Sequence, residues 1–169
     1  MGIGAILNRK KTTRYYWALR QKAIHTPFRP LRMWYRLRHQ AYLEKFGGSI
    51  GLNTKFAGMP VFPHGFQGVF ISEGATIGKD CVIFHQVTIG SNTLPDTKNP
   101  GSPTIGDHVY IGAGAKIIGN VRVGNYVRIG ANCVVTRDVP DNATVVMEAP
   151  RVILRDTPRD NRYVEYNGK

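Results

Sequence analysis

The chain has 169 residues, of which 42% are hydrophobic, and its formal net charge is +12. This length suits one domain with a sizeable core and leaves little room for two. No segment approaches the roughly 18 unbroken apolar residues of a membrane-spanning helix, and the start, MGIGAILNRKK, has its basic residues after the short apolar run, the wrong order for a secretory signal. We therefore expect a cytoplasmic protein.

Residues 1–48 form a basic, aromatic-rich segment. Residues 1–45 hold eleven Lys or Arg against Glu44 alone, so they carry most of the net charge. We expect two helices within residues 10–46, separated near Pro27 and Pro30, because proline disfavours helix continuation. The rest of the chain is nearly neutral and offers no basic face for a phosphate backbone, which predicts no nucleic-acid partner.

Aromatic residues interleave with the cations of residues 9–45. They are Tyr15, Tyr16, Trp17, Trp34, Tyr35 and Tyr42. Such a mixture is typical of helices that lie against an anionic membrane surface, and it predicts peripheral contact with the inner membrane face. The alternative is that these helices cap the end of the following domain or pack around the axis of an oligomer.

A six-residue repeat follows. Aliphatic residues recur at Ile71, Ile77, Ile83, Ile89, Ile105, Ile111, Ile117, Val123, Ile129 and Val135. Small or β-branched apolar residues come four positions after all of these except Ile89, at Ala75, Cys81, Val87, Val109, Ala115, Val121, Val127, Cys133 and Val139. A period of six indicates a short strand plus a corner, so that three hexads close one triangular coil of about 18 residues, stacked about 4.8 Å from the next. A sandwich of short strands would instead show irregular turns every 8–12 residues or so.

Glycine follows the aliphatic residue in six of these hexads, at positions 78, 90, 106, 112, 124 and 130. We expect these glycines to take positive φ at the corners. Cys81 and Cys133 occupy small apolar positions, which predicts buried free thiols rather than a disulfide or a metal site.

The repeat is interrupted between Ile89 and Ile105 by the polar segment SNTLPDTKNPGSPT, residues 91–104. We expect a loop projecting from the prism; such loops commonly carry function, although a plain surface insertion is the alternative. The sequence thus divides into the helical segment 1–48, a repeat domain 49–153 and a polar tail 154–169.

Three stretches together resemble the hexapeptide-repeat acetyltransferases: PHGFQGVFISEGATIGKDCVIFHQVTIGS, the loop, and IGAGAKIIGNVRVGNYVRIGANCVVTRDVP. The nearest branches are the serine acetyltransferases and the capsule or exopolysaccharide O-acetyltransferases, and the resemblance runs from Ile50 to Ile153. It implies an all-β fold, a left-handed parallel β-helix with a short helical N-terminal segment and one extended loop. It also implies a homotrimer with active sites between neighbouring prisms, acetyl-CoA along the groove, a histidine base and no metal.

Two of the five histidines are candidates for the base. His64 stands where the serine acetyltransferase motif carries its base, and His85 lies at an outward hexad position where the family usually has another residue. We expect His64, or His85 in its place, to remove the acceptor proton, a role worth about 10²–10⁴-fold in rate. The alternatives are a corner histidine at 64 and, at 85, a residue that helps to bind the substrate or an ordinary surface residue. His25 and His39 are expected at the surface or in helix packing, and His108 in solvent.

Three departures from the serine acetyltransferase pattern bear on the acceptor. Its acidic residues fall on Ser49 and Pro63, and its loop histidine falls near Ser102. Because a zwitterionic amino acid calls for charged partners, we expect O-acetylation of a saccharide, with serine as the alternative acceptor and a non-catalytic trimeric scaffold as the alternative of another class. The loop residues expected to hold the saccharide are Asn92, Thr93, Asp96 and Asn99.

Acetyl-CoA requires small residues along the groove and cations near its phosphates. By the resemblance, Ala113, Ala131 and Thr136 line the groove, and Arg137 and Arg151 serve the nucleotide end. The alternative for both alanines is that packing of the prism alone requires small side chains.

Overall fold

The computed structural model describes the backbone of residues 3–163 and the side chains of residues 12–163. Two helices, α1 (Ile3–His25) and α2 (Arg29–Glu44), form an antiparallel hairpin, with Pro27 in the turn and Pro30 in the first turn of α2. The two predicted helices are present, although α1 begins before residue 10. Within the described residues, neither helix is long and apolar enough to cross a membrane.

Within residues 3–163, thirteen short strands follow the hairpin. They are β1 (Ser49–Ile50), β2 (Lys55–Phe56), β3 (Phe70–Ile71), β4 (Thr76–Ile77), β5 (Val82–Ile83), β6 (Thr88–Gly90), β7 (Thr104–Ile105), β8 (Tyr110–Ile111), β9 (Lys116–Ile118), β10 (Arg122–Val123), β11 (Arg128–Ile129), β12 (Val134–Val135) and β13 (Thr144–Val145).

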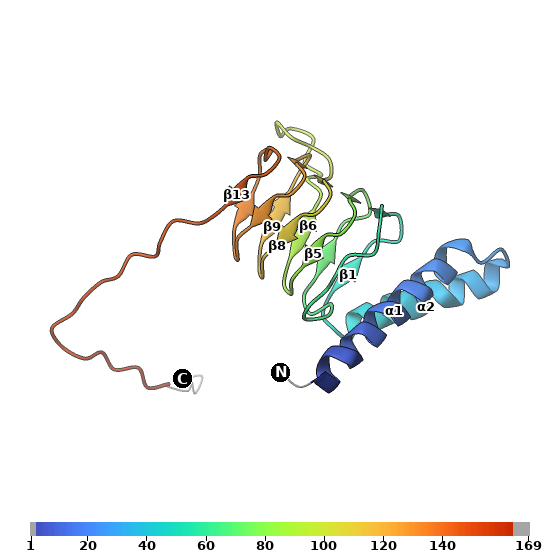
Figure 1. Cartoon of the computed structure of the whole chain (residues 1–169), viewed down its shortest axis with the longest axis horizontal. Coiled ribbons are helices and arrows are strands. Elements are labelled where there is room, and N and C mark those ends of the chain that lie inside the picture. The colour runs from blue at the N-terminus through green and yellow to red at the C-terminus, as the bar shows by residue number, and fades with distance from the viewer. Residues whose placement is uncertain (1–2, 164–169) are drawn as a thin grey trace, which may run out of the picture.

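These strands form three parallel sheets, which we call A (β1-β3-β6-β9-β12), B (β2-β4-β7-β10) and C (β5-β8-β11-β13). Successive strands of the chain belong to different sheets, so the chain winds as a coil with three faces (Figure 1). The predicted fold, a left-handed parallel β-helix of hexapeptide repeats, is confirmed.

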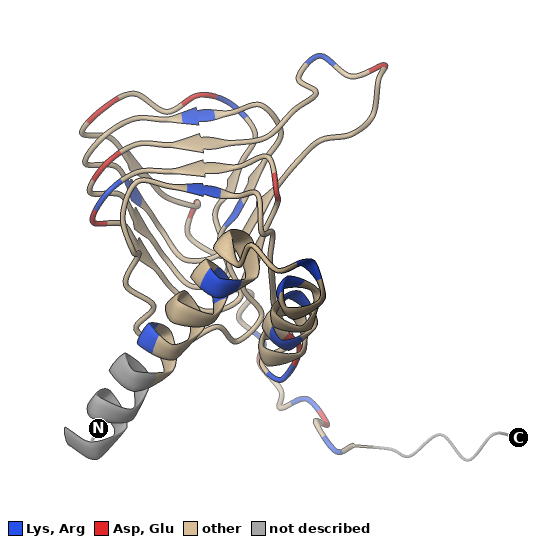
Figure 2. Ribbon diagram, turned by 90° about the vertical axis from the view of Figure 1, so that its right-hand side faces the viewer, with Lys and Arg blue, Asp and Glu red and all other residues tan. Residues whose placement is uncertain are grey.

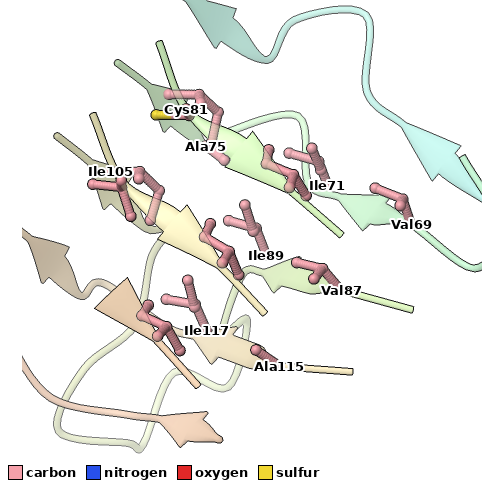
Figure 3. Packing of buried hydrophobic residues seen from close by; sticks show 14 of the residues in the cluster. Val69, Ile71, Ala75, Cys81, Val87, Ile89, Ile105, Ala115 and Ile117 are labelled. Atoms are coloured by element: carbon pink, nitrogen blue, oxygen red, sulfur yellow. The ribbon is translucent and has the colours of Figure 1, made fainter. Parts of the chain in front are cut away.

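The interior of the prism is filled by ladders of like side chains. Parallel register places Ile77 on Ile105 and Ile83 on Ile111, and Ile89 on Ile117. All the predicted aliphatic and small hexad residues are buried (Figure 3). Cys81 and Cys133 are buried free thiols among them, as predicted.

The prediction for the corner glycines is wrong. The glycines with positive φ are 47, 65, 68, 101, 114 and 119, and none of the six hexad glycines is among them. A Cβ on Gly106 would lie 2.8 Å from the carbonyl carbon and oxygen of Gly124 in the next coil. These positions are therefore small because coils approach closely there, and the left-handed corner residues lie two positions later, for example His108 and Asn132.

The hairpin packs on the N-terminal coil through a buried cluster. Tyr16 is fully buried, with its ring 4.6 Å from that of Phe66. Arg20 donates from Nη2 to the carbonyl oxygens of Leu52, at 2.8 Å, and Thr54, at 2.6 Å. The hairpin thus covers the open end of the prism, the alternative that the sequence left open for these helices.

Candidate active site

One column of residues runs along the corner between sheets C and A. The register pairs Val61 with Val82, Val82 with Tyr110, and Tyr110 with Arg128. Three positions further along each coil, this register stacks the predicted site residues His64, His85, Ala113 and Ala131. Backbone hydrogen bonds continue the column, from Gly114 N to His85 O at 3.0 Å and from Asn132 N to Ala113 O at 2.8 Å.

The turn that carries His64 is longer than the equivalent turns of later coils. Position 61 pairs with 82, but position 70 pairs with 88, so the first coil holds three extra residues at this corner. Phe62 and Phe66 are buried on either side of His64, with ring centroids 4.8 Å apart. These two aromatic anchors fix the turn and leave His64 half-exposed between them.

His64 and His85 contact each other directly. Their Nδ1 atoms are 2.9 Å apart and their rings are stacked, with centroids 4.8 Å apart and planes 28° apart. One Nδ1 must donate and the other accept, so the pair holds one proton between these two atoms. The hydrogen bond therefore fixes both ring orientations and leaves the two Nε2 atoms outside this contact.

An aromatic wall, which sequence reasoning missed, lies beside this pair. Phe84 makes an edge contact with the His64 ring at 5.3 Å and 71°, and the Tyr110 ring lies 5.1 Å beyond it. Tyr110 is exposed. The signal was present in the sequence, because Phe84 occupies the position after the aliphatic residue where most hexads have glycine.

The predicted loop lies at a different corner. It connects β6 to β7, between sheets A and B, and an antiparallel bridge between Asn92 and Gly101 closes its base (Figure 1). The Asn92 side chain donates to Thr97 Oγ1 at 2.7 Å and accepts from Leu94 N at 3.1 Å, so it holds the loop together. Thr93 and Asp96 are exposed, and Asn99 is half-buried.

Thr136 and Arg137 also lie at the corner between sheets A and B, where they follow β12 and are exposed. Arg151 is exposed in the extended segment after β13. Within one chain the structure therefore gathers four of the predicted residues in the histidine column. The loop residues, Thr136 and Arg137 lie across sheet A from that column.

The positions that depart from the serine acetyltransferase pattern have other partners. Ser49 is exposed on β1 of sheet A, and Ser102 Oγ lies 2.7 Å from Ser91 Oγ, tying the two ends of the loop. His39 is buried in the hairpin and His108 is exposed, stacked on Tyr126. In the described part of the chain, no three His, Cys, Asp or Glu side chains are grouped as metal ligands.

Comparison with known proteins gives a family match and relatives among the serine acetyltransferases. Residues 102–137 match the bacterial transferase hexapeptide family (six repeats). The serine acetyltransferase of Mycobacterium tuberculosis is 44% identical over 65 residues, which are 38% of this chain and 28% of that protein. That of Synechococcus elongatus is 43% identical over 65 residues, 38% of this chain and 26% of that protein.

Solved structures of serine acetyltransferases are similar over more of the chain. The soybean apoenzyme has a TM-score of 0.62 and 32% identity, covering 80% of this chain and 55% of the soybean chain. Isoform 3 of Entamoeba histolytica, in complex with cysteine, has a TM-score of 0.60 and 29% identity, covering 90% of this chain and 64% of that one. The chain spans less than two thirds of the length of these relatives. The similarity to the hexapeptide-repeat acetyltransferases, near their serine acetyltransferase branch, that the sequence predicted is thus confirmed.

Proposed function

We propose that this protein transfers an acetyl group from acetyl-CoA to a hydroxyl group, with His64 as the general base. The observation that carries the proposal is the 2.9 Å contact between the Nδ1 atoms of His64 and His85 at the head of a column of small residues. The serine acetyltransferase relatives support the same chemistry.

His64 accepts the acceptor's hydroxyl proton on Nε2 as the oxygen attacks the thioester carbon. Its Nδ1–H donates to Nδ1 of His85, which holds the ring in the tautomer that leaves Nε2 basic. When the carbon–sulfur bond breaks, the protonated His64 returns the proton to the thiolate of CoA. His85 thus takes the positioning role that the family gives to an acidic residue, in whose place this chain has Ser49.

The column supports a position for acetyl-CoA along the same corner of the prism. Ala113 and Ala131 follow His85 at successive coils, about 4.8 Å apart, and neither side chain obstructs an extended arm laid along the corner. Thr136 and Arg137 serve the same ligand only if they come from a second copy, because they lie across sheet A within one chain. We infer a homotrimer in which each site joins the histidine column of one prism to the corner carrying the loop of the next, with Arg151 near the nucleotide end.

The identity of the acceptor is a separate part of the proposal. The relatives favour L-serine over the saccharide that the sequence alone suggested. The aromatic wall of Phe84 and Tyr110 beside His64 favours the saccharide as the second candidate acceptor, because an aromatic face packs on the apolar face of a sugar ring. The exposed loop residues Thr93 and Asp96 of a neighbouring prism, with Asn99, are then available for hydroxyl groups.

The test is CoA release from acetyl-CoA, measured with L-serine and with a panel of sugars. We expect His64→Ala to lower kcat by about 10²–10⁴-fold with the accepted substrate. His85→Ala should also lower kcat, and His85→Asn should recover part of the loss, because an amide oxygen can accept the Nδ1–H of His64.

His108→Ala is the matched control, since this histidine is exposed on the corner between sheets B and C. Equal rates for the wild type and His64→Ala would remove His64 from the base role. Absence of CoA release with any acceptor would favour the non-catalytic scaffold.

A further inference from the structure

The outer side of the helical hairpin exposes a run of large apolar side chains. Their exposed fractions are 66% for Phe28, 42% for Leu31, 56% for Met33, 50% for Trp34 and 60% for Leu37. They occupy the turn and residues 31–37 of α2, whereas the buried residues of α2 are His39 and Leu43. We call these five residues the hairpin face.

Unpaired cations flank the hairpin face. Lys22, Arg29 and Arg38 are exposed, and the first acidic residue of the chain is Glu44. Within residues 12–163, the ion pairs involve Asp80 and Asp160, neither of which belongs to the hairpin. Arg38 lies instead over the Trp34 ring, at 5.3 Å. Figure 2 shows the blue Lys and Arg positions along both helices.

The charge argues against a second copy as the occupant of this face. Two hairpin faces in contact would bring these cations together, with Glu44 at the C-terminal end of α2 as the one carboxylate of each hairpin. Like charges at an interface are unfavourable. An anionic partner has the complementary charge. The partner must also offer an apolar region in which aliphatic side chains such as Leu31, Met33 and Leu37 can be buried. A nucleic-acid backbone offers no such region.

A bilayer with anionic headgroups meets both requirements. Trp and Arg side chains favour the headgroup level, and aliphatic side chains favour the adjoining acyl region. The turn between α1 and α2 is the end of the hairpin farthest from the strands (Figure 1), so a flat surface reaches this end first; Met33 and Leu37 also line a groove shared with residues of sheet A. Tyr16, Trp17 and Tyr42 face the prism, which leaves Trp34 as the interfacial tryptophan.

We propose that the hairpin face, with Lys22, Arg29 and Arg38, docks the protein on an anionic lipid bilayer. The proposal is independent of the acetyl transfer proposed above. It narrows the peripheral contact expected for residues 9–45 to one side of the hairpin.

The experiment is co-sedimentation of the full chain with vesicles of phosphatidylcholine, with and without phosphatidylglycerol. We expect binding to the anionic vesicles only. Arg29→Gln with Arg38→Gln should weaken the binding about thirtyfold, and Trp34→Ser with Leu37→Ser at least about tenfold. Tryptophan emission should shift to the blue on binding, and the shift should be absent in Trp34→Phe.

Matched controls lie on the prism and the tail. Lys55→Gln with Arg122→Gln removes two exposed cations of sheet B, and Val134→Ser with Leu154→Ser removes two exposed apolar side chains; both doubles should bind like the wild type. Circular dichroism checks that each variant folds. Equal vesicle binding by the hairpin variants and the control variants would overturn the proposal. So would hairpin variants that lose binding to an oligonucleotide but keep binding to vesicles. A change of oligomeric state in Trp34→Ser with Leu37→Ser, with vesicle binding unchanged, would overturn it as well.

Discussion

Single glycines set how closely the coils stack. Gly106→Ala would place a Cβ 2.8 Å from the backbone of Gly124, and backbone cannot move aside as a flexible side chain can. We expect a loss of about 1–3 kcal/mol in the free energy of unfolding, measured by denaturant titration.

Gly58→Ala is the control at the same corner, because its Cβ would lie 3.6 Å from Lys79 Cα, an ordinary contact. We expect this variant to differ from the wild type by less than about 1 kcal/mol. Equal losses in the two variants would show that close approach is not what selects glycine at position 106.

The hexad residues were predictable from the sequence because each meets the same surroundings in every coil. The glycine conformations were not, because the spacing identifies a corner without showing which of its residues turns left-handed. The contact between His64 and His85 lies in a turn with three extra residues, which no periodicity records. Phe84 was visible as a break in the glycine pattern, but its place against the His64 ring follows from the fold.

At the scale of elements, α1 and α2 are joined by a buried polar pair. His39 Nε2 lies 3.2 Å from Tyr16 Oη. Burial, with the nearby Arg20 cation, lowers the pKa of His39 from its ordinary 6.5 to about 4. Burial also raises the pKa of Tyr16, so its hydroxyl stays protonated.

The unfolded chain therefore binds more protons at this site than the folded chain between pH 4 and pH 6.5. We expect the stability to be intact above pH 6.5 and to fall as the pH decreases towards 4, by about 3 kcal/mol in all. His39→Gln keeps a partner for Tyr16 without titrating, and its denaturation midpoint should change less over this range. An identical pH profile for the two proteins would contradict the assignment.

Elements were predicted well where a pattern recurs or a proline interrupts. The two helices and the interruption of the repeat followed from such signals. The hydrogen bonds of Asn92 within its own loop could not be predicted. The sequence does not show whether a polar loop side chain bonds to a ligand or to its neighbours. The inward packing of Tyr16 likewise depends on the end of the prism it meets.

For the whole molecule, the proposed trimer predicts complementation between chains. His64→Ala impairs the histidine column, and Arg137→Glu impairs the corner that the next prism would contribute. Random mixing of the two inactive chains in one trimer should restore about a quarter of the sites. The measurement is CoA release after refolding an equal mixture.

Each variant refolded alone is the control and should stay inactive. If one chain supplied both corners of a site, the mixed trimers would be no more active than either variant alone. Sedimentation velocity provides the accompanying check, with a trimer expected for the wild type and for both variants.

The placement of the histidine pair in the first two coils has a consequence for how such proteins vary. Every later coil repeats the same register, so whole coils inserted after Val135 would lengthen the prism without moving His64 relative to His85. The length of the prism and the chemistry of the histidine pair are therefore determined by different parts of the chain. One can be extended by duplication while the other is altered by substitutions in a single turn.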